Sequence, residues 1–405
     1  MNKKTIKDVD LAGKTVFIRV DFNVPVKNGN VEDDTRIRGA LPTIKYAIEE
    51  GAKIVLASHL GRPLKDKKKA EEKGGTYDPA KYSLKPVVQK LEALLGSSVQ
   101  FESDNVAEQL SALNPGDVLM RENLRLNAGE EKNDPEFAKM LANGIDVYVN
   151  DAFGTAHRAH ASTEGITHHV ETCVAGLLME KELEFLGKAL HNPERPFVAI
   201  LGGAKVSDKI PVIKSLIERK VDKLLIGGAM AYTFFKAHGY TVGKSLVEDN
   251  MMPTALEVQR SAEVAGVQLL LPSDHQVVDG YDPLNSRKAI PIEFTNAGLV
   301  GLDIGPETAT MFANALEGAK TIVWNGPMGM FEEKPFDEGT LAIARAVAKA
   351  TEAGGTSIVG GGDSVDAINQ AGLADKISHI STGGGATLEF LAGDVLPGVA
   401  ALDDK

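Results

Sequence analysis

Four arginines follow four short apolar runs in the first 160 residues of this chain. The runs read as buried strands at Thr15–Phe22, Lys53–His59, Asp117–Asn123 and Asp146–Phe153, and the arginines are Arg36, Arg62, Arg125 and Arg158. If these strands form one parallel sheet, their carboxyl ends meet at one edge. A guanidinium group binds phosphate or carboxylate through two parallel hydrogen bonds. One arginine alone would more often form a surface ion pair, but four of them favour an anion site, with Asp21, Asn23 and His59 nearby.

Glycine-rich turns follow the apolar runs of the second half. Gly202-Gly203 precedes Lys205 and Lys209, which stand one helical turn apart and could point at the same phosphates. Two further turns, Gly360–Ser364 and Ser381–Gly385, open helices, and a helix N-terminus favours phosphate through its free N–H groups and its dipole. These turns predict a second site for a phosphorylated ligand.

Three side chains near these turns suggest a magnesium nucleotide. Asp363 could be an ordinary N-cap, but beside a phosphate-binding turn its carboxylate would also suit Mg²⁺. Asn325 and Glu332 follow another strand, where they form either a plain turn or the wall of a nucleoside pocket. The residues therefore favour a kinase that holds a small polyanion in one half and a magnesium nucleotide in the other.

The elements that must position these residues follow an alternating order. Continuous apolar runs separated by helical periodicity indicate buried parallel strands, hence an α/β fold. In the second half we predict strands at Pro196–Gly203, Lys223–Gly228, Gln268–Asp274, Leu299–Gly305, Thr321–Gly326 and Ser357–Gly362. We predict helices at Leu84–Leu95, Asp208–Lys220, Thr308–Glu317 and Glu338–Ala353. The pattern predicts two doubly wound, Rossmann-like domains.

A helical stretch at Cys173–Leu190 separates the two series and ends before Pro193. We expect a first domain over residues 1–172, this interdomain helix over 173–190, a second domain over 191–390 and a C-terminal segment over 391–405. Two lobes joined in this way predict a cleft and relative motion. The polar segment Lys65–Lys81 has no apolar periodicity, and we predict a mobile surface loop there.

Composition excludes several classes of protein. With 405 residues, of which 43% are hydrophobic and 25% charged, the chain is typical of soluble globular proteins. A net charge of −12 argues against binding to nucleic acid, and no apolar run is long enough for a membrane span or a signal peptide. One cysteine, Cys173, fits a reducing cytoplasm. The segment Gly239–Ser245 resembles a P-loop, but its glycines are too close together and it follows a helical stretch instead of a strand.

Eight ordered blocks resemble the phosphoglycerate kinase family and span nearly the whole chain. They are RVDFNVP (Arg19–Pro25), SHLGRP (Ser58–Pro63), ENLR (Glu122–Arg125), NDAFGTAHRAH (Asn150–His160), GGAKVSDK (Gly202–Lys209), WNGP (Trp324–Pro327), GGGDS (Gly360–Ser364) and STGGGA (Ser381–Ala386). The resemblance implies reversible transfer of the acyl phosphate of 1,3-bisphosphoglycerate to MgADP, which gives 3-phosphoglycerate and MgATP. It also implies a cytoplasmic monomer whose domains close by a hinge.

The resemblance implies a role for each candidate residue. The residues expected to bind 3-phosphoglycerate are Asp21, Asn23, Arg36, His59, Arg62, Arg125 and Arg158. Those expected to bind ATP or ADP are Gly203, Lys205, Lys209, Asn325, Glu332, Gly361, Gly362, Asp363 and Ser364, with Asp363 also on Mg²⁺. The catalytic set implied is Arg36, Lys205, Gly361 and Gly384.

Four departures from the family pattern, Arg121, Leu126, Met328 and Met330, remove none of these residues. A Rossmann-like dehydrogenase and a catalytically silent scaffold remain as alternatives. The missing GxGxxG motif argues against the dehydrogenase, and the intact set of Arg, Lys and Asp residues argues against the scaffold.

Overall fold

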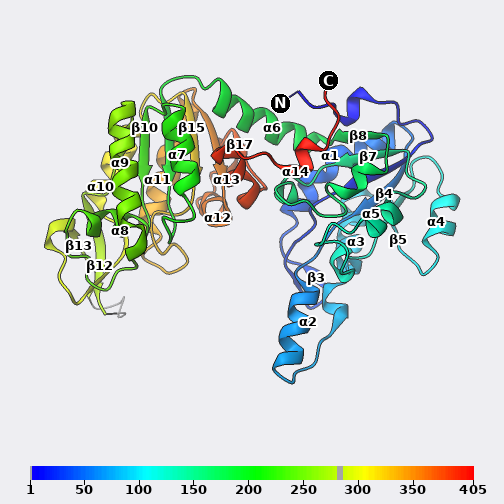
Figure 1. Ribbon diagram of the computed structural model, residues 1–405, viewed down its shortest axis with the longest axis horizontal. Coiled ribbons are helices and arrows are strands. Elements are labelled where there is room, and N and C mark those ends of the chain that lie inside the picture. Colours follow the sequence, from blue (N-terminus) through cyan, green and yellow to red (C-terminus); the bar gives the residue numbers. More distant parts are fainter. Residues whose placement is uncertain (1, 281–285) are drawn as a thin grey trace. The chain divides into compact units, whose positions relative to one another are not determined.

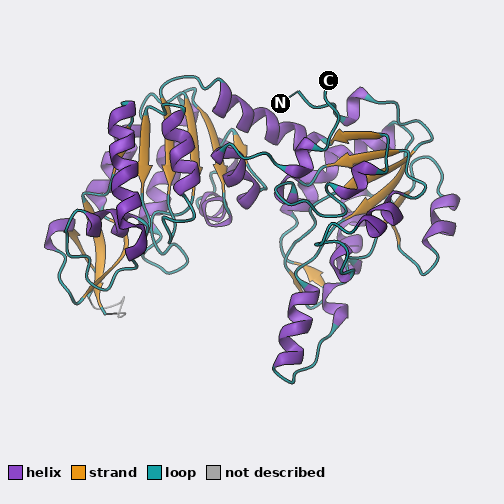
Figure 2. Cartoon of the chain, in the orientation of Figure 1, coloured by secondary structure: helices purple, strands orange, loops and turns teal. Residues whose placement is uncertain are grey.

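The computed structural model describes residues 2–280 and 286–405, and the chain divides into two compact units. Unit 1 comprises Met1–Glu184 together with Val395–Lys405, and unit 2 comprises Phe185–Asp394. Each unit contains a six-stranded parallel sheet with helices on its faces (Figures 1 and 2). The predicted fold class, α/β with two parallel sheets, is confirmed.

The sheet of unit 1 has the strand order β5-β6-β4-β1-β7-β8, and every pair is parallel. Its strands are β1 (Thr15–Arg19), β4 (Lys53–Ala57), β5 (Gln100–Phe101), β6 (Val118–Met120), β7 (Val147–Asn150) and β8 (Thr172–Ala175). The helices are α1 (Thr35–Glu49), α2 (Pro63–Glu72), α3 (Lys85–Leu95), α4 (Val106–Ala112), α5 (Pro135–Ala142) and the C-terminal α14 (Pro397–Ala400). A short hairpin joins β2 (Val26–Lys27) to β3 (Asn30–Val31). The central strands are buried on both faces, which explains their continuous apolar sequence.

The larger sheet of unit 2 has the order β11-β10-β9-β15-β16-β17 and is also parallel throughout. Its strands are β9 (Phe197–Leu201), β10 (Lys223–Ile226), β11 (Gln268–Leu270), β15 (Thr321–Asn325), β16 (Thr356–Gly360) and β17 (His379–Ile380). The helices are α7 (Ile210–Glu218), α8 (Ala231–Ala237), α9 (Met252–Ala265), α10 (Pro306–Leu316), α11 (Glu338–Glu352), α12 (Gly362–Gln370) and α13 (Gly384–Ala392). Trp324 lies fully buried in the core of this unit.

One strand prediction in unit 2 is wrong in its sheet assignment. The run at Leu299–Ile304 forms β14, but it pairs with β12 (Asp274–Asp279) in a separate antiparallel sheet of order β13-β12-β14, where β13 is Lys288–Pro291. β14 is nearly as buried as a central parallel strand. Its apolar run therefore carried no sign of the different partner.

The stretch predicted as an interdomain helix is shorter than expected. Cys173 lies in β8, which pairs with β7, and helix α6 (Leu177–His191) begins only after Gly176. A carboxylate oxygen of Asp151 accepts hydrogen bonds from the backbone N–H groups of Leu178 (2.9 Å) and Met179 (3.2 Å), which holds the first turn of α6. The division between the two units falls inside this helix.

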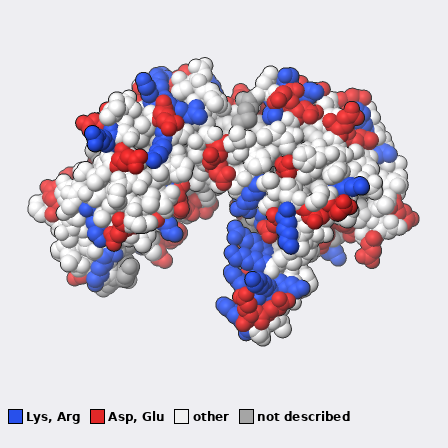
Figure 3. All heavy atoms as spheres, viewed as in Figure 1, with Lys and Arg blue, Asp and Glu red and all other residues white. Residues whose placement is uncertain are grey.

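The loop predicted at Lys65–Lys81 is also wrong, because most of it is the helix α2 (Pro63–Glu72), followed by a 3-10 turn at Pro79–Tyr82. Pro63 at the first helical position and a run of Lys, Ala and Glu favour a helix by intrinsic propensity. Only Pro63 is buried, so the helix shows no apolar stripe. Lys and Arg side chains gather over this helix, with acidic side chains among them (Figure 3).

The last residues of the chain lie against the first unit. The amide of Asn150 donates to the backbone oxygen of Gly398 (3.0 Å), and the Lys3 ammonium donates to the backbone oxygen of Leu402 (2.7 Å). Residues 395–405 therefore belong to unit 1 although they follow unit 2 in sequence. Within the described residues, no helix is long and apolar enough to cross a membrane.

Candidate active site

The four arginine-bearing loops of unit 1 follow four strands that are neighbours in the sheet. Strands β6, β4, β1 and β7 stand side by side and all run in one direction. Their carboxyl ends therefore lie along one edge, and the loops that follow them supply the side chains of the candidate anion site. The spatial order of the strands brings together loops that are more than 100 residues apart in sequence.

Asp21 orders the side chains next to β1. The Arg36 guanidinium, from the first turn of α1, pairs with the Asp21 carboxylate at 2.8 Å, and His59 Nδ1 lies 3.9 Å from the other carboxylate oxygen. Arg36 remains about one third exposed, so part of its guanidinium is free to meet a ligand. The structure thus brings Asp21, Arg36 and His59 together.

The loop after β4 is held from both sides. The backbone N–H of Gly61 donates to the side-chain oxygen of Asn23 (2.9 Å), and the backbone oxygen of Gly61 accepts from Arg125 Nη1 (2.9 Å). Asn23 and Arg125 therefore fix the backbone that leads into α2. Arg62, at the N-cap of α2, has an exposed side chain.

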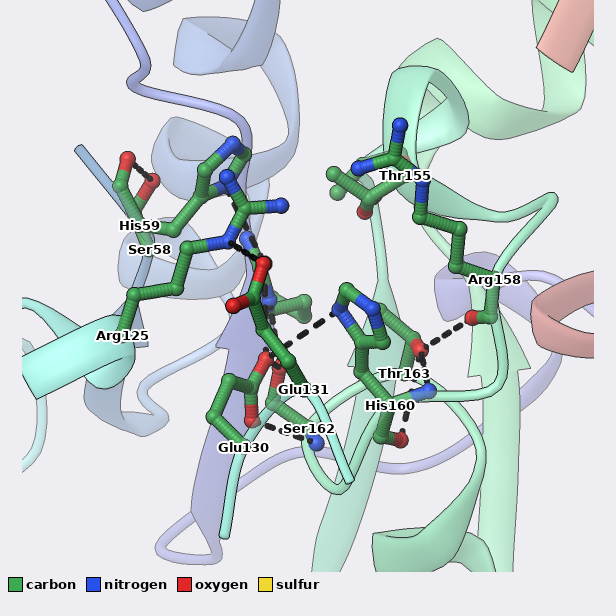
Figure 4. A network of polar contacts seen from close by, with 12 residues as sticks. Ser58, His59, Arg125, Glu130, Glu131, Thr155, Arg158, His160, Ser162 and Thr163 are labelled. Atoms are coloured by element: carbon green, nitrogen blue, oxygen red, sulfur yellow. Dashed lines mark hydrogen bonds and ion pairs between the residues drawn. The ribbon is translucent and has the colours of Figure 1, made fainter. Parts of the chain in front are cut away.

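His160 lies near Arg125 and Arg158, His59 lies near Arg125, and this environment keeps both imidazoles neutral (Figure 4). Burial, together with the nearby charges of Arg125, Arg19 and Arg158, lowers the pKa of His160 to about 4. Burial and the surrounding arginines also hold the pKa of His59 well below its usual range. Because several cations lie close enough to disfavour a further positive charge, this edge of the sheet is suited to an anion.

Arg19 and Glu130 are buried members of this network that sequence reasoning missed. Both side chains are fully buried, with Arg19 Nη2 3.9 Å from a Glu130 carboxylate oxygen. Arg19 Nε donates to the Ser162 hydroxyl (2.7 Å), which in turn donates to Glu130 (2.6 Å). Arg19 opens the RVDFNVP block, but an arginine inside an apolar strand gives no sign of whether it meets a ligand or a buried carboxylate. Here Arg19 meets the buried carboxylate of Glu130, and its Nη2 also lies 3.3 Å from His59 Nδ1.

In unit 2 the corresponding loops follow β9, β15, β16 and β17, which are also neighbours. Lys209, only 8% exposed, donates a hydrogen bond from its ammonium group to the side-chain oxygen of Asn325. Burial lowers the pKa of Lys209 to about 8, although Asp208 and Asp363 oppose the shift. The side-chain N–H₂ of Asn325 is buried and has no hydrogen-bond partner among the described residues. Lys209 and Asn325 thus present donors to a ligand that carries oxygen atoms.

Two helix N-termini meet next to these donors. Gly361 precedes α12 with φ of 94°, a left-handed conformation that favours glycine, and a Cβ there would lie 3.1 Å from the Asn325 side chain. A Cβ on Gly384, the first residue of α13, would lie 3.8 Å from Gly361 Cα. The first N–H groups of both helices lack partners within the helix, so they form a suitable place for phosphate.

The other predicted residues of unit 2 surround this point. Ser364 is buried and accepts a hydrogen bond from the backbone N–H of Gly326 (2.7 Å), which holds the turn after β15. Gly362 is the exposed first residue of α12, and the Lys205 side chain is exposed. Gly203, Glu332 and Asp363 line a cavity of about 400 Å³. Its apolar walls include Phe235, Leu246, Pro272, Val300, Leu302 and Met328.

Asp363 is suited to a hard cation. Burial and the neighbouring carboxylates of Glu332 and Asp366 raise the pKa of Asp363, while Lys209 lowers it. A carboxylate crowded by other carboxylates gains from a divalent cation, and oxygen ligands are those that Mg²⁺ prefers. Among the described residues, no group of three or more His, Cys, Asp or Glu side chains could hold a metal by itself. Any Mg²⁺ here would take most of its ligands from the nucleotide phosphates and from water.

The chain is thus an α/β protein with two six-stranded parallel sheets. A candidate anion site lies at the carboxyl ends of the strands in unit 1, and a candidate nucleotide cavity lies in unit 2. The family model described as phosphoglycerate kinase matches residues 6–394. The chain is 53% identical to the phosphoglycerate kinase of Chloroherpeton thalassium and 54% identical to that of Moorella thermoacetica, and each match covers all of both chains.

Solved structures agree with these relatives. The phosphoglycerate kinase of Coxiella burnetii, at 41% identity, gives a TM-score of 0.87, and that of Pyrococcus horikoshii, at 34% identity, gives 0.80. Both matches cover 98% of each chain. The chain belongs to the phosphoglycerate kinase family. Its reaction is the reversible phosphoryl transfer between 1,3-bisphosphoglycerate and ADP that yields 3-phosphoglycerate and ATP, a step of glycolysis.

Proposed function

We propose that unit 1 binds the phosphoglycerate and unit 2 binds the nucleotide. The observation that carries the proposal is the surplus of cationic side chains around two neutral histidines in unit 1. Phosphoglycerates carry carboxylate and phosphate groups, which this charge suits. The residues assigned to phosphoglycerate are Asp21, Asn23, Arg36, His59, Arg62, Arg125 and Arg158.

The nucleotide would lie in the cavity of unit 2, with its phosphates toward the helix ends. The side-chain N–H₂ of Asn325, without a partner among the described residues, and the ammonium of Lys209 support this direction, since both can donate to phosphate oxygens. Glu332, on the cavity wall, would accept from the ribose hydroxyls. The full set assigned to nucleotide is Gly203, Lys205, Lys209, Asn325, Glu332, Gly361, Gly362, Asp363 and Ser364.

Catalysis in this proposal is positioning and charge stabilisation. Arg36 and Lys205 would flank the phosphoryl group in transfer, and the N–H groups near Gly361 and Gly384 would bind its oxygens. The attacking and leaving oxygens both belong to the substrates, so no covalent intermediate with the protein is needed. When bound, Mg²⁺ would be held by Asp363 and would neutralise charge on the nucleotide phosphates.

Because each substrate is assigned to a different unit, the units must bring their ligands to reacting distance. We propose a hinge at α6, since the division between the units falls within that helix. Excluding water during transfer would protect the acyl phosphate from hydrolysis. Small-angle scattering with both substrates should show a smaller radius of gyration than with either alone. An unchanged radius would count against the hinge.

A coupled assay tests the proposed function directly. The full chain is mixed with 3-phosphoglycerate, MgATP, glyceraldehyde-phosphate dehydrogenase and NADH, and absorbance loss is followed. Loss that depends on this protein, on 3-phosphoglycerate and on Mg²⁺ would support the assignments in both units. Folded protein that binds nucleotide by calorimetry but gives no turnover would favour a scaffold role instead.

We also propose a cytoplasmic monomer that has no nucleic-acid or membrane partner. The net charge of −12 supports the absence of a phosphate-backbone partner. The single cysteine is buried and free, which suits a reducing compartment. Sedimentation equilibrium at micromolar concentration tests the monomer, because a dimer would double the observed mass.

A further inference from the structure

Helix α2 and the turn after it carry a surplus of positive charge that the proposed function does not use. Residues 62–81 contain seven Lys and Arg residues against four Asp and Glu residues, although the whole chain has a net charge of −12. Only Pro63 of the helix is buried, and Figure 1 shows the helix standing out from the rest of unit 1. The helix therefore contributes charge to the surface and almost nothing to the core.

Three lysines of α2 have no ion-pair partner among the described residues. Lys65, Lys67 and Lys69 are exposed, whereas Lys68 lies 3.9 Å from the carboxylate of Glu72, one turn further along. Lys65 and Lys69 are four residues apart, so they lie on the same face of the helix. An ammonium group without a nearby carboxylate keeps its full field in the surrounding water, because no opposite charge cancels it.

The beginning of α2 is fixed to the candidate anion site. Arg62, one of the arginines assigned to phosphoglycerate, is the N-cap of the helix. The backbone of Gly61 is held by hydrogen bonds to Asn23 and Arg125, each 2.9 Å long. Along the helix the lysines precede the two glutamates, which come only in its last turn. The more positive half of α2, which also contains the positive end of the helix dipole, thus lies nearer the site.

The far end of the segment is fixed to the neighbouring loop of the same site. The Tyr82 hydroxyl donates to the carboxylate of Asp66 on α2 at 2.9 Å. The backbone oxygen of Tyr82 accepts a hydrogen bond from the side-chain amide of Asn123, also at 2.9 Å. Asn123 belongs to the loop after β6 that carries Arg125. Because both ends are held by loops of the anion site, the lysines are kept beside that site instead of on a free tether.

We propose that the exposed lysines of α2 steer phosphoglycerate toward the anion site of unit 1 and raise its rate of association. The proposal rests on the assignment of that site to phosphoglycerate. The ligand carries carboxylate and phosphate charges that a protein of net charge −12 repels, and a local positive field beside the site offsets this repulsion during the approach. Charges that act at a distance change association more than dissociation, because they make no contact that must break when the ligand leaves.

The association rate constant is measured on the full chain with 3-phosphoglycerate as the probe. Calorimetry gives the Kd, the line shape of the phosphorus NMR signal gives the dissociation rate constant, and the two together give the association rate constant. The double variant Lys65→Gln with Lys69→Gln removes two charges and keeps the helix propensity. We expect its association rate constant to be about threefold to tenfold lower at about 0.01 M ionic strength, where charges act over roughly 30 Å. At about 0.15 M, where they act over roughly 8 Å, the decrease should be less than about twofold.

A matched control separates the local field from the net charge of the protein. Lys45 and Lys139 are exposed and lie in the C-terminal halves of α1 and α5, which lead to the amino ends of β4 and β7. These ends are opposite to the edge that carries the anion site. Lys45→Gln with Lys139→Gln changes the net charge by the same amount as the α2 variant and should keep the wild-type association rate constant. An equal decrease in both variants would overturn the proposal.

Charge reversal provides a graded version of the same test. Lys65→Glu with Lys69→Glu changes the charge of α2 by twice as much, so the decrease at low ionic strength should be about twice as large on a logarithmic scale. In both α2 variants the dissociation rate constant and kcat should stay at the wild-type values. A decrease that persists at about 0.15 M, or a changed dissociation rate constant, would indicate a short-range contact and refute steering.

The readout distinguishes this proposal from the proposed function. Rate constants for binding need no turnover, so they can be measured even if the coupled assay fails. If 3-phosphoglycerate does not bind the wild-type chain, the assignment of the anion site is wrong and steering is wrong with it. If it binds and the α2 variants keep the wild-type association rate constant at low ionic strength, the proposal is overturned while the assignment of the site stands.

Discussion

Lys209 should make nucleotide affinity fall as the pH rises through about 8. Its ammonium is buried beside Asn325, and burial is the main cause of a pKa lowered from 10.5 to about 8. A shift of that size corresponds to about 3 kcal/mol against the charged form in the free protein. A bound phosphate would favour the charged form again. Only the protonated side chain pairs with phosphate, so the affinity is present below pH 8 and lost above it.

The expected magnitude follows from the fraction of charged Lys209. With a pKa of about 8, roughly nine tenths of the side chain is protonated at pH 7 and roughly one tenth at pH 9. The Kd for MgADP should therefore rise about tenfold between these two values. Lys209→Arg should show a flat profile because guanidinium stays charged. Lys209→Met should bind weakly at every pH.

Calorimetry in buffers of different ionisation enthalpy measures both the Kd and the protons taken up. Near pH 8 we expect about half a proton to be taken up per nucleotide bound. Lys205→Met is the matched control, because it removes a lysine that is exposed in the structure and should keep the pH dependence of the wild type. A Kd that stays constant from pH 7 to 9, with no proton uptake, would refute the reasoning.

Three further predictions concern unit 1. Arg36→Ala should lower kcat roughly 10³-fold if its guanidinium stabilises the phosphoryl group in transfer, whereas a loss under tenfold with a raised KM would restrict Arg36 to binding. Arg19→Met leaves the buried Glu130 without its cation and should lower the free energy of unfolding by about 3–5 kcal/mol in urea. The pair Arg19→Met with Glu130→Gln should recover more than half of that loss, and no recovery would contradict the pairing. Arg125→Ala should raise the pKa of His160 from about 4, measured by NMR titration, because a nearby cation is removed; an unchanged pKa would show that Arg125 does not contribute to the shift.

The sequence predicted the α/β class and most strands from simple regularities. Continuous apolar runs identified β1, β4, β9 and β15, because strands covered on both faces need such runs. The same rule failed for β14, which is nearly as buried in an antiparallel sheet. Burial is what the pattern records, and two different sheets can bury a strand to the same degree.

Three other errors of the sequence predictions have different physical causes. The lysine-rich run of α2 has high helix propensity but no apolar stripe, so a search for apolar periodicity missed it. Cys173 shows the opposite case, since its pairing with β7 in the sheet overrode a helical pattern that continues into α6. Short strands such as β5 and β17 also escaped notice, because two residues give no measurable pattern.

By itself the sequence determined the family, the order of the elements and the kind of chemistry at each strand end, because these depend on residue types and short spacings. Only the tertiary structure decided which side chains those residues contact. Arg19 meets Ser162 across 143 residues, and Tyr232 meets His275 across 43. Partners so distant in sequence are chosen by strand order and burial, and burial also lowers the pKa of Lys209.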